Sequence, residues 1–532
     1  MTRPPGLIHE FLRQLESKQS PHSESNRDLP RYDVQNPTDR GLLVTSSRPQ
    51  HFFLGTGASI FTNYLIPAIT SAQHEVVLVT CFWASSRTLT ALCDALSKLA
   101  AHRRRLVQEA RATGSTPIPP LHFRICLSSR SLLQKLLHPQ SRSGYTYPPA
   151  SWHKKLGLPE PALLEAGGIR LEAKSLFFLP FSVMHPKFVI IDRQRAFVPS
   201  CNVSWESWLE GCVEITGDAV RALFAFYSRT WEDPADTQPA RDARSDRVPA
   251  VPADSEAAGT SWDGAEAGLV MVRSTAHLCV DLESHDTVAT LVLPSSYHRN
   301  PRFRPFPWQR SPPPPDTPLN IASLQLFERA QRSIYIQTPN LTCESVIIAL
   351  LDALARGVDV NIVTSRNMML LEQLVTAGTT TSWCIRSLIR RFCRLKAAPG
   401  GKQKAQSGGG DASRDLEAGQ PNTDTRVGRL LIWYFHAKNP SSPGVLEGQP
   451  AVATRPQGEE PVHSHLKLTL VDAEYALMGS GNLDRASWFT SQELGILFQS
   501  RELCAKIKAA VDGVLEGRLD LIFDSDHATG SN

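Results

Sequence analysis

Two stretches of the sequence repeat one pattern of polar residues, and this repetition constrains the fold more than any other feature of the chain. Each stretch reads His, any residue, Lys, four residues, Asp, six residues and then x-Ser-x-Asn. The matching residues are His185, Lys187, Asp192, Ser200 and Asn202 in the first copy, and His465, Lys467, Asp472, Ser480 and Asn482 in the second. Chance does not readily explain five residue types recurring at one spacing, so we expect the two copies to build a single composite site.

Alternation along a β-strand predicts where these side chains point. Successive side chains on a strand face opposite sides, so His185 and Lys187 share one face, as their counterparts do in the second copy. The apolar runs 188–191 and 468–471 indicate buried strands. A short turn after each Asp then leads into a second strand, over 196–198 or 475–478. This hairpin brings Ser and Asn back beside His and Lys.

This set of side chains suits the chemistry of a phosphoryl group. Two lysine ammonium groups, with the amide and hydroxyl donors, can neutralise a dianionic or pentacoordinate phosphoryl group. Paired histidines can supply a nucleophile and a proton donor near neutral pH. The chemistry calls for no metal and no cofactor, and the sequence has no Asp, Glu and His spaced as ligands for one.

The duplicated motif resembles the signature of the phospholipase D superfamily, HxKxxxxD followed by GSxN. The resemblance implies that one histidine, expected to be His185, attacks phosphorus and forms a phosphohistidine, while His465 protonates the leaving oxygen. It implies that the Lys and Asn residues hold the phosphoryl oxygens, with both Ser nearby. Asp192 and Asp472 fit a supporting role in which each orients a histidine. Similar enzymes carry a Glu shortly after the Asn, which suggests that Glu214 and Glu493 support the histidines.

A further resemblance concerns the substrate. Residues 337–340 and 355–360 resemble the second half of cardiolipin synthases and bacterial-type phospholipases D, so we expect phosphatidyl transfer or phospholipid hydrolysis. A nuclease or DNA-adduct phosphodiesterase of the same fold is the alternative, although enzymes resembling tyrosyl-DNA phosphodiesterases generally lack the Asp of the motif. A third hypothesis is a catalytically silent phosphate-binding or scaffold protein. Pro199, in place of the usual Gly, supports that hypothesis because proline removes a backbone donor.

The order of predicted elements indicates the fold class. A helix, a strand, a helix and a strand are predicted over 58–72, 75–82, 88–102 and 122–127, and again over 320–330, 333–338, 345–356 and 358–364. This order predicts an α/β protein with two similar layered lobes of the phospholipase D fold, each with a central mixed sheet flanked by helices, and an active site in the cleft between them. The predicted parts are an N-terminal helix and polar arm (1–50), a first lobe (51–232), a disordered linker (233–266) and a second lobe (267–525) with flexible insertions near 301–318, 396–425 and 439–460.

Composition restricts the setting in which the chain works. A net charge of +4 permits an anionic substrate but does not by itself indicate a nucleic-acid-binding protein. The ten cysteines show neither metal-ligand nor disulfide spacing, which favours a reducing, intracellular compartment. The N-terminal residues read as neither a signal peptide nor a clear transit peptide, and no stretch reaches the ~18 apolar residues of a membrane span. The expected location is therefore cytoplasmic or peripheral to a membrane.

Two amphipathic helices are predicted outside the motifs. Residues 7–15 have apolar residues at helical spacing, which favours a docking helix over a membrane anchor. Residues 382–396 combine basic residues with an apolar face, as in a helix on an anionic membrane or in a core-packed helix with a solvated face. The expected partners are a phospholipid substrate and a peripheral membrane surface. Nucleic acid is the weaker alternative, and no obligate protein partner is evident.

Overall fold

The computed structural model describes most of the chain. The described residues are 6–18, 31–131, 134, 144–178, 182–232, 277–282, 286–296, 306, 308, 312–397, 426–438 and 460–527. The predicted linker at 233–266 lies outside the described residues, as do nearly all of the insertions predicted at 396–425 and 439–460 and much of the one at 301–318.

In the first half of the chain, three parallel strands and three antiparallel strands form a mixed sheet. The strands are β2 (Glu75–Phe82), β3 (Leu121–Ser129), β5 (Ile169–Ser175), β8 (Phe188–Ile191), β9 (Arg195–Pro199) and β10 (Trp208–Thr216). β2, β3 and β5 pair in parallel, while β8, β9 and β10 follow as antiparallel neighbours on the other side of β2. Helix α5 (Arg87–Thr113) connects β2 to β3; the Ser86 side chain caps its start, and Gly114 ends it with a φ of 63°.

In the second half, six strands pair in the same order. The strands are β13 (Ser333–Gln337), β14 (Asp359–Ser365), β15 (Leu430–Phe435), β17 (Leu468–Val471), β18 (Tyr475–Gly479) and β19 (Glu493–Gln499). β13, β14 and β15 are parallel, and β17, β18 and β19 follow β13 as antiparallel neighbours. Helix α10 (Glu344–Ala355) connects β13 to β14 as α5 connects β2 to β3. The motif hairpins are therefore β8–β9 and β17–β18, as the sequence predicts.

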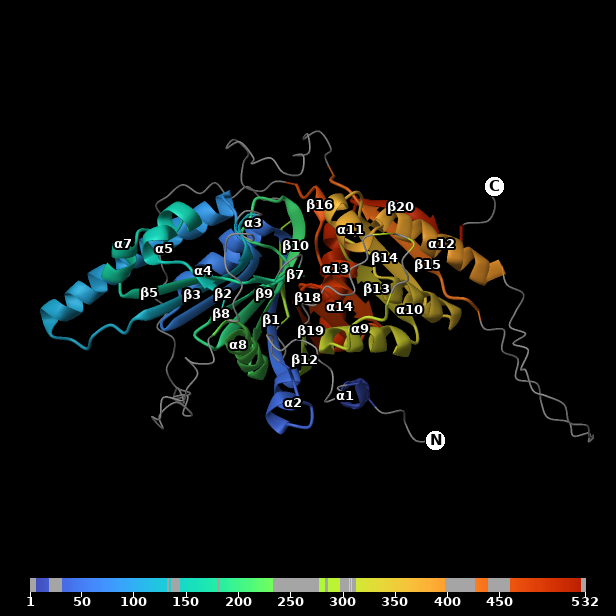
Figure 1. The fold of residues 1–532 in the computed structure, drawn as a ribbon, viewed down its shortest axis with the longest axis horizontal. Helices are drawn as coiled ribbons and strands as arrows, with labels where there is room; N and C mark the ends of the chain where they lie inside the picture. The colour runs from blue at the N-terminus through green and yellow to red at the C-terminus, as the bar shows by residue number, and fades with distance from the viewer. Residues whose placement is uncertain are drawn as a thin grey trace, which may run out of the picture.

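Strand β1 (Val44–Thr56) links the two halves. It pairs with β10 along residues 48–56 and with β12 (Val288–Ser295) along 44–47, and β12 in turn pairs with β19. Among the described residues, 18 strands are thereby joined into one mixed sheet. Each half thus has a mixed sheet, and β1 joins the two because it satisfies its backbone groups against both halves. The polar arm predicted through residue 50 ends earlier, since β1 begins at Val44. Figure 1 shows β2, β3, β5 and α5 to one side of β1 and β12, and β13, β14, β15 and α10 to the other.

Helices cover the sheet and make the protein a mixed α/β structure, as predicted (Figure 1). The remaining helices and strands include α2 (Pro37–Leu43), α3 (Gly57–Ile60), α4 (Ile66–Thr70), β4 (Tyr145–Thr146), α7 (Pro161–Ala166), β6 (Phe177–Phe178), β7 (Ser182–Val183), α8 (Asp218–Trp231), β11 (Leu278–Asp281), α9 (Pro318–Arg329), α11 (Leu370–Ala377), α12 (Thr381–Ala397), β16 (His463–Ser464), α13 (Arg485–Phe489), α14 (Arg501–Leu515) and β20 (Leu519–Asp524). The motif strands β8 and β17 are buried along their whole length. Each strand therefore holds the His and Lys at one end and the Asp at the other in fixed positions.

The N-terminal helix α1 (Leu7–Lys18) docks on the chain itself. Its apolar side chains Leu7, Phe11 and Leu15 are buried in the core, and it packs against α9. Lys18 adds an ion pair with Asp316 at 3.3 Å. Within the described part of the chain, no helix combines the length and the apolar character that a membrane crossing requires.

Candidate active site

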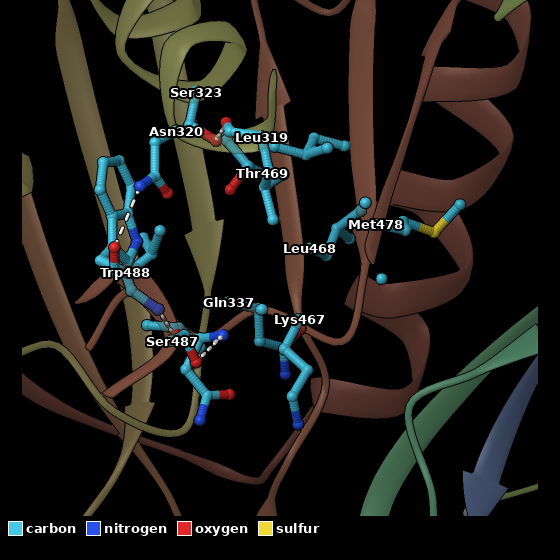
Figure 2. Close-up of a pocket in the computed structure, with 17 residues that line it drawn as sticks. Leu319, Asn320, Ser323, Gln337, Lys467, Leu468, Thr469, Met478, Ser487 and Trp488 are labelled. Carbon is cyan, nitrogen blue, oxygen red and sulfur yellow. Dashed lines mark hydrogen bonds between the residues drawn. The ribbon is translucent and has the colours of Figure 1, made fainter. Parts of the chain in front are cut away.

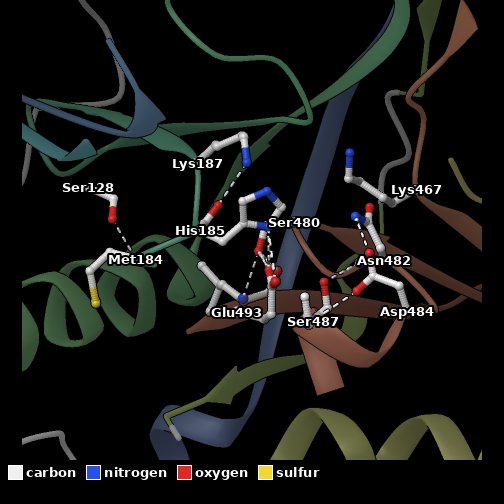
Figure 3. A network of polar contacts seen from close by, with 12 residues as sticks. Ser128, Met184, His185, Lys187, Lys467, Ser480, Asn482, Asp484, Ser487 and Glu493 are labelled. Carbon is white, nitrogen blue, oxygen red and sulfur yellow. Dashed lines mark hydrogen bonds and ion pairs between the residues drawn. The ribbon is translucent and has the colours of Figure 1, made fainter. Parts of the chain in front are cut away.

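The first motif histidine is oriented by a glutamate from the other half of the chain. His185 directly follows an isolated bridge between Met184 and Gln492, and its backbone N–H donates to the Gln492 carbonyl at 3.0 Å. Its ring Nδ1 lies 2.8 Å from Oε2 of Glu493, the first residue of β19 (Figure 3). The strand that follows the second motif therefore positions the histidine of the first.

The second motif histidine has the reciprocal arrangement. The backbone N–H of His465 donates to the Leu209 carbonyl at 2.8 Å, beside a parallel pairing of β16 with β10. Its ring Nδ1 lies 2.8 Å from Oε1 of Glu210, which belongs to β10. Each half of the chain thus supplies the carboxylate that orients the other half's histidine, and the two motifs form one site.

The motif serines support these glutamates. The Ser200 hydroxyl donates to Glu210, and the Ser480 hydroxyl donates to Glu493. Each serine oxygen also accepts a backbone N–H, from Gly211 at 2.9 Å and from Leu494 at 3.0 Å. Both hydroxyl protons are therefore directed at a carboxylate, so the serines support the glutamates that orient the histidines.

Both motif lysines are buried beside the histidines. Lys187 is 1% exposed and Lys467 is 4% exposed. Each ammonium donates to the backbone carbonyl of its own motif histidine, at 2.9 Å for Lys187 and 2.8 Å for Lys467. Neither forms an ion pair within 4.0 Å with a described carboxylate. The site therefore holds two cationic groups that an anionic ligand can neutralise.

Burial changes the charges that these groups carry. Burial lowers the pKa of Lys467 to about 7 and raises that of Glu210 to about 7. The pKa of His185 is lowered by burial, partly opposed by Glu493, and burial together with Lys467 and Lys187 lowers the pKa of His465 further. The pKa of Glu493 is lowered, since its contacts with His185 and Ser480 outweigh burial, which acts to raise it. Both imidazoles are therefore neutral near pH 7.

The two histidines differ at the second ring nitrogen. The Lys467 ammonium lies 2.8 Å from Nε2 of His465 and 2.9 Å from Nδ1, so it is close to both nitrogens of this ring. Nε2 of His185 forms no hydrogen bond with any described residue, and this histidine is also the more exposed, with 13% of its side chain accessible against 3% for His465. Since Nδ1 of His185 faces a carboxylate, its proton sits on Nδ1 and Nε2 carries the free lone pair.

The two asparagines also differ. Oδ1 of Asn202 accepts the Phe82 N–H at 3.2 Å, so its amide nitrogen remains to donate. The amide nitrogen of Asn482 instead donates to Asp484 at 3.1 Å, and its Oδ1 has no partner among the described residues (Figure 3). As the side chains stand, the amide nitrogen of Asn202 is left to donate, whereas Asn482 presents an acceptor.

A small cavity adjoins Lys467 and Asn482 on the side of the second motif (Figure 2). Its volume is about 40 Å³, and Gln337, Ser487 and Asn320 contribute polar groups to its wall. The side-chain carbonyl oxygens of Gln337 and Asn482 are buried without a partner among the described residues. The wall is mostly apolar, but a space of this size has room for a few water molecules, which would give both oxygens a partner.

The structure contradicts the predicted role of Asp192 and Asp472. The Asp192 carboxylate accepts backbone N–H groups at the start of β2, at 2.9, 2.7 and 2.8 Å. Asp472 does the same just before and at the start of β13. Both residues have positive φ, 50° and 55°, in the hairpin turn. A strand of four residues, roughly 13 Å long, separates each Asp from its Lys, so each Asp fastens a turn instead of orienting a histidine.

Glu214 also lies outside the site. Its carboxylate binds Nδ1 of His51 at 2.8 Å and Nε of Arg195 at 2.8 Å. Glu210, four residues earlier on the same face of β10, takes the histidine-supporting role that was predicted for Glu214. Spacing from the Asn misleads here, because the glutamate comes eight residues after Asn202 but eleven after Asn482, where α13 intervenes. Counting back from the strand ends would have found it, since β10 and β19 both end six residues after the glutamate.

The Pro199 substitution does not disturb the first copy. Pro199 lies in β9, paired with Cys212 of β10. The next residue, Ser200, donates its N–H to Gly211 at 2.8 Å, and Ser480 donates to Leu494 at 3.0 Å in the second copy. The local hydrogen bonding that places the serines and glutamates is thus the same in both motifs.

Comparison with known proteins agrees with the resemblance found in the sequence. Residues 324–404 match the family model described as cardiolipin synthase, PLD-like domain. This segment includes β13, α10, β14, α11 and α12, and it precedes the second motif. The resemblance to the phospholipase D superfamily is confirmed. Its cardiolipin synthase-like character, predicted from residues 337–340 and 355–360, falls within the matched segment.

Several solved structures are similar over much of the chain. Phosphatidylserine synthase of Haemophilus influenzae Rd KW20 is 14% identical, with 92% of each chain covered and a TM-score of 0.47. Polyphosphate kinase of Porphyromonas gingivalis is 11% identical, covering 88% of this chain and 48% of that one, with a TM-score of 0.41. Nuc, a phospholipase D family member of Salmonella typhimurium, is 13% identical, covering 44% of this chain and 97% of that one, with a TM-score of 0.24. No curated protein matches the chain.

Proposed function

We propose that the chain is a phosphatidyltransferase or phospholipase that acts on phospholipid phosphodiesters through a covalent phosphohistidine. The observation that carries the proposal is the reciprocal pairing of His185 with Glu493 and of His465 with Glu210. The carboxylate at Nδ1 of His185 leaves Nε2 of that ring free to attack, and the second oriented imidazole, His465, can serve as the acid, so the two rings divide the roles of nucleophile and acid.

In the first step, Nε2 of His185 attacks phosphorus and a P–N bond forms. The bond from phosphorus to the leaving oxygen breaks, and His465 gives that oxygen a proton. The assignment of nucleophile follows the difference between the rings, since Nε2 of His185 is free and Nε2 of His465 faces the Lys467 ammonium. Ionised Glu493 would stabilise the positive charge that develops on the His185 ring during attack.

In the second step, His465 takes a proton from the incoming water or alcohol, whose oxygen attacks phosphorus as the P–N bond breaks. Lys187, Lys467 and Asn202 hold the phosphoryl oxygens in both steps. Their charge matters more here than in water because the site is buried. A phosphodiester would also raise the pKa of His465 by supplying a nearby negative charge, so that the ring can carry the proton it must donate.

The covalent step is tested by trapping. The protein is quenched during turnover of labelled phosphatidylglycerol, labelled phosphatidylcholine or single-stranded DNA, in parallel reactions. A phosphoramidate is labile to acid but comparatively stable to alkali, so we expect one alkali-stable lipid adduct per chain, located at His185 by mass spectrometry. His51→Ala is the matched control, because His51 also pairs with a glutamate but lies outside the site.

Each other outcome changes the proposal in a defined way. An adduct at His465 would reverse the two histidine roles. Label from DNA alone would replace the lipid substrate with a nucleic acid. Turnover without an adduct on either histidine would reject covalent catalysis, and the absence of turnover on all three substrates would favour a silent phosphate-binding protein.

A further inference from the structure

Two consecutive helices of the second half expose a group of large apolar side chains. On α11, Leu371 is 75% exposed, Leu374 43% and Val375 36%, and Trp383 at the start of α12 is 54% exposed. These four residues, called the apolar patch below, lie within thirteen positions of one another. Single exposed apolar side chains are ordinary on a protein surface, but a group of them marks a contact site.

The apolar patch belongs to an ordered part of the fold. Leu371, Leu374 and Val375 are spaced so that they share one face of α11. Gln373, on the opposite face, is buried; its amide nitrogen donates to Asn340 at 2.8 Å and its carbonyl oxygen accepts from the Thr381 hydroxyl at 3.0 Å. These bonds fix the buried face of α11 against the core and against the start of α12. The apolar side chains on the other face are therefore held toward solvent.

A row of cations continues from the apolar patch along α12. Arg386, Arg390 and Arg394, called the arginine row below, follow Trp383 at helical spacing and are exposed. None of them forms an ion pair with a described residue, and α12 contains no acidic residue. Arg391, by contrast, points toward α10 and pairs with Glu344 at 2.6 Å. The exposed face of α12 therefore carries uncompensated positive charge.

The sequence allowed α12 to lie with its apolar face on a membrane or to pack that face against the core. The buried residues of α12 exclude the first arrangement. Ile385, Leu388 and Phe392 are buried in the core of the protein. They cannot also enter a bilayer, so α12 is not an interfacial helix that presents this apolar face to lipid. Any membrane contact must use the outer face, where Trp383 and the arginine row lie.

We propose that the apolar patch and the arginine row together form the surface by which the chain docks on a bilayer of anionic phospholipid. Leucine, valine and tryptophan side chains suit the boundary between head groups and acyl chains, and arginines suit the anionic head groups beside them. Nucleic acid would account for the arginines but not for Leu371 and the other apolar residues. The combination of the two signals favours lipid, since stable anchoring requires more than one.

The position of this surface suits the proposed function, on which the inference rests. Helix α11 packs against α13, which begins three residues after the motif residue Asn482. Helix α11 also follows β14 closely, whose last residue, Ser365, donates to the carbonyl of Ser464, the neighbour of His465. Docking through α11 would therefore hold the composite site near the lipid that it acts on.

Binding is measured by sedimentation with vesicles of phosphatidylcholine alone and of phosphatidylcholine mixed with phosphatidylglycerol. We expect the chain to bind the mixed vesicles, and Arg386→Gln with Arg390→Gln to weaken binding by about fivefold per arginine. Leu371→Ser with Leu374→Ser should weaken it further, and that loss should persist in high salt, where the arginine contribution is screened. The matched controls are Arg104→Gln with Arg105→Gln, on the exposed face of α5, and Leu521→Ser with Ile522→Ser on β20; both should bind as the unchanged chain does.

Turnover of a water-soluble short-chain phosphodiester is measured in parallel, because it depends on the site and not on the bilayer. Patch variants that keep this activity but lose vesicle binding would support the proposal. If the soluble substrate is not turned over while vesicle binding still depends on the patch, the proposed function fails and the docking surface stands. Absence of binding to the mixed vesicles, patch variants that bind normally, or an arginine effect seen only with duplex DNA would each overturn the docking proposal.

Discussion

Glu493 lies 2.8 Å from His185, although 308 positions separate the two residues in the sequence. Glu210 and His465 form the matching contact at 2.8 Å across 255 positions. Neither half of the chain contains both members of either motif pair, His185 with Glu493 or His465 with Glu210, so the two halves must fold together before either motif histidine is oriented. A residue that orients a catalytic histidine affects rate far more than it affects substrate affinity.

The first prediction compares two glutamates on β10. Glu210→Gln should lower kcat by roughly 10²–10⁴-fold, with a smaller change in KM. The neutral amide orients the His465 ring less firmly than the carboxylate does, and it cannot stabilise the positive charge of the protonated ring. Glu214→Gln, four residues away and paired with His51 and Arg195, should keep kcat within a few fold. Steady-state kinetics on folded protein decides this. An equal effect of the two changes would show that Glu210 acts only on folding.

The second prediction concerns the sharing of one site. His185→Ala and His465→Ala should each lower turnover by about 10⁴-fold or more, because a nucleophile and its acid partner act as a unit. His51→Ala, the matched histidine outside the site, should leave kcat nearly unchanged. Two independent half-sites would instead leave about half of the activity in each variant, which would contradict the composite site.

The motif aspartates show how far sequence reasoning reaches. The spacing correctly identified Asp192 and Asp472 as parts of the motifs. The role predicted for them, orienting the histidines, was wrong. A carboxylate near a histidine in the sequence suggests an acid–base pair, whereas the intervening buried strands carry each Asp to the far end of its hairpin. There the carboxylates accept backbone N–H groups at the edge of the neighbouring strand, a contact that depends on tertiary structure.

The third prediction follows from that corrected role. Asp192→Ala should reduce the free energy of unfolding by about 1–3 kcal/mol, because several backbone N–H groups lose a charged acceptor. Asp192→Asn should recover part of the loss, since Asn tolerates the positive φ and can still accept. Urea unfolding measures both. The kcat of the folded variants should remain within a few fold of that of the unchanged chain. A loss of kcat by orders of magnitude would instead show that Asp192 orients a histidine.

The fold was most predictable where strands are wholly buried. The runs 75–82, 188–191 and 468–471 match β2, β8 and β17 at both ends. Short, continuous apolar runs of this kind are typical of strands that are buried on both faces. Strand β1 was missed because its first residues are polar and Pro49 interrupts them, and the pairing with β10 is irregular at that point. These residues become a strand through long-range partners, β10, β11 and β12, which the local sequence does not indicate.

The fourth prediction concerns stability and pH. Burial lowers the pKa of Lys467 from 10.5 to about 7, so the unfolded chain binds more protons between these values and the free energy of unfolding rises with pH across them. Burial raises the pKa of Glu210 from 4.5 to about 7, so the folded chain binds more protons there and stability falls as pH rises through that window.

Variants separate the two contributions to stability. Lys467→Met should flatten the rise above pH 7, and Glu210→Gln should flatten the fall below it. Lys98→Met, at an exposed position on α5, should change neither slope. Urea unfolding across the pH range measures all three variants, and a rise above pH 7 that persists in Lys467→Met would contradict the assignment to Lys467.

The last prediction concerns activity and pH. Lys467 must be charged to hold a phosphoryl group, so its lowered pKa of about 7 should make kcat/KM fall as pH rises above 7. In the complex the phosphodiester favours the charged ammonium and raises its pKa, so the same limb in kcat should appear at higher pH. Since Glu210 also titrates near 7, the assignment depends on Lys467→Arg. Arginine stays charged throughout, so this variant should lose the limb in kcat/KM even if its overall activity is low. Lys98→Arg should keep the limb, and a limb that survives in Lys467→Arg would assign it to Glu210 or to a histidine instead.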